Sequence, residues 1–294
     1  MPCASAAALL AGVVDYAGLF PPAGLSMSGA AAEYEAALTS ADAWMLGRFV
    51  VPATRLPELA EARAALHPIN PWLISAIVRD GSSDDLAAIA AFNAAAARHN
   101  ARVDTVEAKP QSLAGVDWLA EQAGTGLDVY VEVAPGPDVD AWLARVAARS
   151  LRAKVRTGGL TANAFPTPTA LAAFINAAVR HQVPFKATAG LHHAVRGPYR
   201  LTYDDGAEHA PMYGYLNVLL ATAALRAGRP QGIAEALLQH TDTSALVFAD
   251  GAVSWGAEQF PLSTVRDTRR HQLVSFGSCS FREPVEEFDA LVSR

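Results

Sequence analysis

The chain has 294 residues, and 51% of them are hydrophobic, which is enough for one large core or two small ones. The 29 acidic and 23 basic residues leave a net charge of −6. This composition excludes a basic nucleic-acid-binding protein and a polybasic membrane patch as default interpretations. Cys3 and Cys279 are the only cysteines, too few for a disulfide scaffold or a cysteine-rich zinc site, and they favour a reduced, cytoplasmic compartment.

Targeting and membrane segments are not expected. The first 18 residues are apolar but carry no positive charge, unlike a secretory signal peptide. Each long apolar stretch is interrupted by a charge, glycine or proline before it reaches about 18 residues. We therefore expect neither a membrane partner nor a nucleic-acid partner.

Short β-branched segments alternate with Ala/Leu-rich helical patterns along most of the chain. The predicted strands are residues 12–16, 44–51, 72–78, 102–107, 127–133, 151–156, 183–188 and 273–277. The predicted helices between them are residues 30–38, 56–66, 84–99, 113–122, 139–148 and 168–181. Two helix starts carry local signals: Ser82 stands three residues before Asp85, and Thr167 precedes Pro168.

The spacing of these elements predicts the fold. The second to seventh strands recur about every 25 to 30 residues, and no change in composition marks a domain boundary. Eight strands with intervening helices predict a single (β/α)8 TIM barrel over residues 1–294. An open doubly wound sheet is the alternative, but no Gly-x-Gly-x-x-Gly motif follows an early strand.

The last unit is longer than the others. Residues 196–272 are predicted to form an insertion between strands seven and eight, with a polar loop, helices over 212–227 and 233–240, and a hairpin around Asp250 and Gly251. A helix from residue 284 closes the chain. Because long loops at this end of a barrel often carry function, residues 197–211 are predicted to form a lid over the site.

Lysine is rare in this chain. Only Lys109, Lys154 and Lys186 occur, against 20 arginines. A desolvated lysine can lose its proton and act as a base or nucleophile, whereas arginine cannot. Lys154 and Lys186 fall near the ends of adjacent predicted strands, so both should face the barrel mouth, and their repulsion should lower the pKa of one. The alternative is that both are paired with acids such as Glu107 or Glu132.

Five short motifs stand on the first, fourth, sixth, seventh and eighth predicted strands. They are VDYAGLFPPA around Asp15, RVDTV around Asp104, KVRTG at Lys154, KATAG at Lys186 and SFGSCSF over residues 275–281. In this order they resemble the motifs of the deoxyribose-phosphate aldolases, a class I aldolase family with a TIM-barrel fold. The resemblance spans most of the chain.

The resemblance implies catalytic roles. Lys154 would be the Schiff-base nucleophile, and Lys186 would lower its pKa. Asp104 would transfer protons with a water or a neighbouring group, and Asp15 would support the network from the first strand. No organic cofactor is implied.

The resemblance also implies an anion site. Gly277, Ser278 and Ser280 would offer backbone N–H groups to an anion or a phosphate. Arg156 departs from the family, because it replaces a small serine and adds a fixed cation that could bind a carboxylate or phosphate, or pair with Glu132.

The segment after Lys186 departs from the family as well. Thr188 and Gly190 stand in place of the family's paired glycines, and His192 and His193 follow them. We expect these four residues to contact the substrate, with His192 facing the site. A metal site is the alternative role for His192, together with His209 and the nearby acids Asp204, Asp205 or Glu208.

The predicted function is that of a class I aldolase-like lyase acting on a small anionic carbonyl compound, without cofactor or metal and with a possible homo-oligomer. One alternative is a metal-dependent lyase or isomerase that uses His192, Glu132 and Glu107. The other is a non-catalytic barrel that binds an anion through Arg156, Lys154 and Lys186. Cys279 is interpreted as a buried structural residue, because the sequence places no histidine beside it.

Overall fold

Eight parallel strands close into a barrel in the computed structural model, which describes residues 2–68 and 70–293. In spatial order they are β1 (Val14–Tyr16), β13 (Leu273–Ser278), β7 (Phe185–Thr188), β6 (Arg152–Arg156), β5 (Asp128–Glu132), β4 (Ala101–Ala108), β3 (Trp72–Val78) and β2 (Leu46–Pro52). Every neighbouring pair is parallel, and β1 pairs with both β2 and β13. The predicted (β/α)8 barrel is confirmed, and the open sheet is excluded because no strand of this sheet is an edge.

Three strands, β1, β2 and β7, start two residues later than the hydrophobic pattern predicts, and a local cause is evident at β1 and β7. Gly12 has a φ of +58°, a left-handed conformation that does not belong to a strand, so β1 starts only at Val14. Pro184 has no N–H group, and β7 starts at the next residue, Phe185. Both differences shorten a strand at its N-terminal end and leave the mouth of the barrel unchanged.

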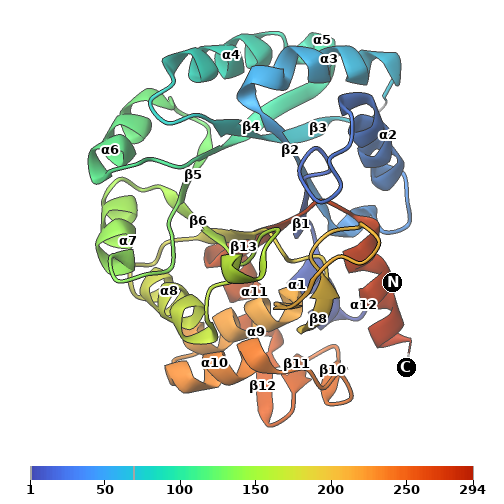
Figure 1. The fold of residues 1–294 in the computed structure, drawn as a ribbon, viewed down its shortest axis with the longest axis vertical. Coiled ribbons are helices and arrows are strands. Elements are labelled where there is room, and N and C mark those ends of the chain that lie inside the picture. Colours follow the sequence, from blue (N-terminus) through green and yellow to red (C-terminus); the bar gives the residue numbers. More distant parts are fainter. Residues whose placement is uncertain (1, 69, 294) are drawn as a thin grey trace.

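Helices surround the strands (Figure 1). They are α2 (Met27–Leu38), α3 (Leu56–Ala65), α4 (Ser83–Ala94), α5 (Ala96–His99), α6 (Leu113–Gln122), α7 (Val139–Ala148), α8 (Pro168–Arg180), α9 (Tyr215–Arg226) and α12 (Arg282–Val292). Both predicted caps are present: Ser82 Oγ accepts the N–H of Asp85 at 3.2 Å, and Thr167 Oγ1 accepts that of Ala170 at 3.2 Å. The predicted helix over 84–99 is divided at Ala95 into α4 and α5.

The segment between β7 and β13 contains more elements than the sequence predicted. It holds the hairpin β8 (Gly197–Arg200) and β9 (His209–Met212), the helices α9, α10 (Gln231–Gln239) and α11 (Leu262–His271), and the sheet β10 (Leu246–Phe248), β11 (Ala252–Trp255) and β12 (Glu258–Pro261). The predicted hairpin around Gly251 is the β10–β11 pair. Neither α11 nor the N-terminal helix α1 (Ala4–Leu10) was predicted. In α11 only Val265 and Thr268 are buried, which leaves little hydrophobic periodicity to read.

The barrel interior is charged near its mouth. Asp15, Glu107, Lys154 and Lys186 are all buried, although barrel interiors are usually filled by branched apolar side chains. Apolar side chains on the same strands, such as Val155, are buried as well and belong to the main core. In the described part of the chain, no helix is both long and apolar enough to cross a membrane.

Candidate active site

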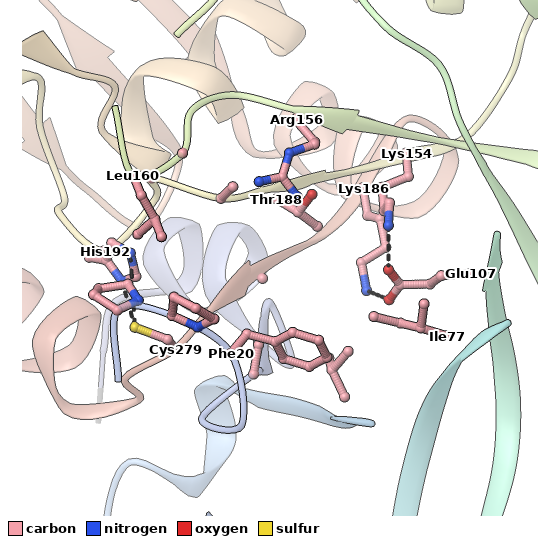
Figure 2. Close-up of a pocket in the computed structure, with 18 of the residues that line it drawn as sticks. Phe20, Ile77, Glu107, Lys154, Arg156, Leu160, Lys186, Thr188, His192 and Cys279 are labelled. Atoms are coloured by element: carbon pink, nitrogen blue, oxygen red, sulfur yellow. Dashed lines mark hydrogen bonds and ion pairs between the residues drawn. The ribbon is translucent and has the colours of Figure 1, made fainter. Parts of the chain in front are cut away.

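A chain of ion pairs joins five strands inside the barrel. Lys186, which is fully buried on β7, donates to Asp15 Oδ2 at 2.5 Å and to Glu107 Oε1 at 2.6 Å. The other oxygen of Glu107 accepts from Lys154 Nζ at 3.1 Å, so this carboxylate bridges the two lysines (Figure 2). Lys154 also contacts Glu132 Oε2 at 3.1 Å. The two lysines therefore contact three carboxylates, and Glu107 is the one that both of them contact.

Neutral donors complete the hydrogen bonding of these carboxylates. Ser75 donates to Glu107 Oε1 at 2.7 Å, and Ser275 donates to Asp15 Oδ2 at 2.8 Å. The backbone N–H of Arg48 donates to Asp15 Oδ1 at 2.9 Å. Because each buried charge has partners on several sides, the side chains are held in one arrangement.

The ion pairs fix the charges of this cluster. Burial alone would lower the pKa of Lys186, but Asp15 and Glu107 outweigh it and raise that pKa above its ordinary value. Burial would raise the pKa of Glu107, but Lys186 and Lys154 hold it well below its usual range. For Glu132, burial is likewise outweighed by Lys154 and Lys109, and its pKa is lowered. Glu107 thus offsets the lysine–lysine repulsion expected from the sequence. This is the alternative that the sequence left open, in which both lysines are paired with acids.

A cavity of about 220 Å³ opens beside Lys154 and Lys186. Most of its wall is apolar, with Phe20, Ile77 and Leu160 among the lining residues. Five residues predicted to contact substrate also line it, namely Arg156, Thr188, Gly190, His192 and Gly277. Figure 2 shows the lysines and Glu107 at one end of the cavity and His192 with Cys279 at the other.

Asp104 does not join the predicted cluster. Its carboxylate accepts two hydrogen bonds from the guanidinium of Arg48, at 2.7 and 2.9 Å, and it does not line the cavity. The register between β3 and β4 shifts between Val103 and Thr105, which leaves Asp104 in a bulge. Lys154, Lys186 and Asp15 do converge, as expected, but the acid of β4 that meets them is Glu107.

Part of the predicted anion site around residues 277–280 is engaged in the protein's own hydrogen bonds. Ser278 Oγ lies 3.2 Å from His192 Nδ1 and accepts the N–H of Ser280 at 3.3 Å. Ser280 Oγ in turn accepts the N–H of Glu283 at 3.2 Å. Neither serine lines the cavity, and of the three residues expected to bind an anion only Gly277 does.

The two adjacent histidines diverge. His192 lines the cavity, whereas His193 does not. His193 Nδ1 lies 2.5 Å from Glu287 Oε1, and its ring stacks on that of Tyr199 at 3.4 Å between centroids. His193 is therefore part of the packing between this loop and α12, not a substrate contact as the sequence suggested.

Cys279 has a histidine beside it, contrary to the sequence interpretation. Its Sγ lies 3.6 Å from His192 Nδ1 and lines the cavity. Burial raises the pKa of this thiol to about 11, and burial together with His193 lowers the pKa of His192 to about 4. Both groups are thus neutral at pH 7. The sequence did contain a signal for this contact. His192 follows the seventh predicted strand and Cys279 follows the eighth, and these two strands are neighbours in a closed barrel.

The metal ligands considered for the alternative function do not come together. Glu107 and Glu132 contact the lysines, whereas His192 lies near Ser278 and is 3.6 Å from Glu283 Oε2. Within residues 2–68 and 70–293, no group of three or more His, Cys, Asp or Glu side chains is arranged to hold a metal ion.

Fold and cavity together define a (β/α)8 barrel with ion-paired lysines at its mouth. Neither the known protein families nor the curated proteins include a match to this sequence. Among solved structures, a mutant of FabK from Thermotoga maritima is similar, with a TM-score of 0.39 and 15% sequence identity. That match covers 66% of this chain and 59% of the FabK chain.

Proposed function

We propose that the protein is a class I aldolase-like lyase that forms a Schiff base between Lys154 and a small anionic carbonyl compound. The observation that carries the proposal is the difference between the two lysines. Both lysines line the cavity, but Lys154 keeps 6% of its surface exposed, whereas Lys186 is fully buried. Lys154 is therefore the more accessible of the two amines to a substrate carbonyl.

The contacts of Lys154 supply the proton transfers that this chemistry needs. Glu107 and Glu132 each stand 3.1 Å from Nζ and can accept the proton that the ammonium must lose. The free amine then adds to the carbonyl carbon, and loss of water from the carbinolamine leaves an iminium. Cleavage of the adjacent C–C bond places its electron pair in an enamine. Protonation of the enamine and hydrolysis of the resulting iminium return Lys154.

Lys186 acts in this proposal as a positioning residue. Its ion pairs with Glu107 and Asp15 hold the bridging carboxylate against Lys154. Its raised pKa keeps it an ammonium at neutral pH, so it is not the nucleophile. Asp104, paired with Arg48, has no part in the proton transfers.

Borohydride trapping tests the proposal. Incubation with pyruvate or an aldehyde and borohydride should add one reduced adduct, located by peptide mass spectrometry at Lys154. Lys154→Ala should abolish the adduct, while Lys109→Ala, which changes a lysine with 66% of its side chain exposed, should keep it. An adduct at Lys186 in the Lys154→Ala variant would show that the nucleophile is Lys186 on β7 and not Lys154 on β6.

The two alternatives predict different results. A metal-dependent lyase would lose activity with a chelator and regain it with a divalent ion. A non-catalytic anion-binding barrel would show no adduct with any carbonyl compound, and Lys154→Arg would retain ligand binding.

A further inference from the structure

Arg156 is a cation of the cavity wall. It lies two residues beyond Lys154 on β6, so both side chains are on the same face of the strand. Figure 2 shows its guanidinium beside Thr188, directed into the cavity. Lys154 and Lys186 are ion-paired, but Arg156 makes no ion pair within the described residues. A planar guanidinium in this position suits a carboxylate or a phosphate of the ligand.

A phosphate is the less suitable of these two anions. The N-terminus of α12, next to β13, is the helix end that could bind one, but Glu283 stands in its first turn. The N–H groups of Ser280 and Glu283 are already bonded to serine hydroxyls. A phosphate at Arg156 would therefore have one guanidinium and no free helix N-terminus, whereas a carboxylate can be bound in bidentate fashion by the guanidinium alone.

The remainder of the cavity is built for apolar groups. Its wall includes the apolar side chains of Phe20, Pro22, Ile77, Leu160 and Met212. Hydroxyl groups buried against these side chains would lose their hydrogen bonds to water without replacement. A polyhydroxylated sugar phosphate is therefore a poor match to this surface.

We propose that the substrate is a 4-hydroxy-2-oxo acid with an alkyl or aryl group at C4, bound through its carboxylate at Arg156. This inference rests on the proposed function, because it places C2 at Lys154. The carboxylate is bonded directly to C2, so one small molecule can meet both side chains. The apolar group at C4 would lie along the wall formed by Phe20, Leu160 and Met212.

The reaction balances without an oxidant or reductant. The C3–C4 bond breaks and its electron pair moves into the enamine, while the C4 hydroxyl proton passes to a base and C4 becomes an aldehyde. C3 then takes up a proton, and water hydrolyses the iminium. The products are a 2-oxo acid and an apolar aldehyde, and the amine of Lys154 is restored.

Binding of oxamate, an unreactive analogue of pyruvate, tests the carboxylate site independently of imine formation. Calorimetry should show that Arg156→Met weakens oxamate binding at least tenfold, while Arg282→Met, which changes an 84% exposed side chain, leaves it unchanged. Thermal unfolding of both variants checks that they are folded. Equal oxamate affinity in the Arg156 variant and the wild type, or tighter binding of inorganic phosphate than of oxamate, would overturn the inference.

Trapping experiments separate this inference from the proposed function. Methyl pyruvate lacks the charge, so Arg156→Met should lower adduct formation with pyruvate but not with methyl pyruvate. In the direction of C–C bond formation with pyruvate, hexanal or benzaldehyde should give at least a tenfold higher kcat/KM than glyceraldehyde. If glyceraldehyde or its phosphate is preferred, the apolar substrate class is wrong although the Schiff base stands. Absence of any adduct at Lys154, with oxamate binding still dependent on Arg156, would reject the lyase and leave a carboxylate-binding barrel.

Discussion

Glu107 is the residue through which the two lysines of the cavity are connected. It is almost fully buried, and each of its oxygens accepts from a different lysine. Its charge is one of the two that raise the pKa of Lys186. Removing that charge while keeping the shape of the side chain therefore leaves ammonium groups with too few counter-ions in a buried place.

Glu107→Gln is expected to lower the free energy of unfolding by about 3 to 5 kcal/mol, because it breaks a buried ion-pair network. Urea unfolding at pH 7 measures this change. The matched control is Glu58→Gln, which changes a solvent-exposed acid paired with Arg55 and should leave stability nearly unchanged. A Glu107→Gln protein as stable as the wild type would show that the bridge contributes little.

The thiol of Cys279 provides a second test at the residue scale. Because burial raises its pKa to about 11, alkylation by iodoacetamide should be slow at pH 8 and should increase until the pH passes about 11. The experiment uses the Cys3→Ser variant, in which Cys279 is the only thiol. Bound oxamate should slow the reaction further. A rate that reaches its plateau below pH 9 would indicate that His192 activates the thiol.

At the scale of elements, the β8–β9 hairpin forms part of the cavity wall. Leu201 and Met212 line the cavity from this hairpin and the turn that follows β8. Tyr203 donates to Glu283 Oε2 at 3.0 Å and so ties the turn to α12. The role of residues 197–211 as a lid stays a prediction.

Shortening the turn tests the lid without removing its buried residues. Replacing residues 202–207 by Asn-Gly retains the β8–β9 pairing, and Thr202–Ala207 contains no buried residue. We expect kcat/KM to fall at least tenfold, because water enters the cavity, while Tm changes by about 2 °C or less. Steady-state kinetics and thermal unfolding measure the two effects. Full turnover in the shortened protein would count against the lid.

The contact between β1 and β2 depends on a glycine. A Cβ on Gly47 would stand 2.5 Å from Asp15 Oδ1 and 3.1 Å from the carbonyl oxygen of Val14. Gly47→Ala should therefore displace Asp15 from Lys186 and cost about 1 to 3 kcal/mol of unfolding free energy. Gly136→Ala is the control, since a Cβ there meets nothing within 4 Å. Denaturant unfolding of both variants measures this difference. Equal stability of the two variants would contradict the prediction.

For the whole molecule, the ion pairs inside the barrel predict loss of stability in acid. The pKa values of Glu107 and Glu132 in the folded protein lie below the ordinary value of 4.5. Each group therefore contributes stability that is fully present above pH 4.5 and is lost as the pH falls through its folded pKa. The urea concentration at the unfolding midpoint, measured from pH 7 to pH 3, should decrease once the pH is below about 5. Glu132→Gln should make this decrease less steep. An unchanged slope in that variant would show that other acids dominate.

The amino-acid sequence by itself determined the barrel and the position of its lysines. Alternating β-branched and helical segments are local patterns, and they specified six of the helices between strands and all eight barrel strands to within a few residues. The spacing of Lys154 and Lys186, one βα unit apart, placed them on adjacent strands, and they are indeed paired in the register of β6 and β7. Capping at Ser82 and Thr167 is likewise decided within four residues.

Only the tertiary structure decided which acid meets the lysines and which groups share the cavity. A bulge in β4 sets Asp104 apart, and no sequence period signals a bulge, so Glu107 was seen only as a possible counter-ion. Cys279 and His192 are 87 residues apart and meet because the barrel closes. At the anion site expected at residues 277–280, Ser278 Oγ lies within hydrogen-bond distance of His192, which follows another strand. Such contacts depend on how strands and loops pack against each other, which local residue patterns do not encode.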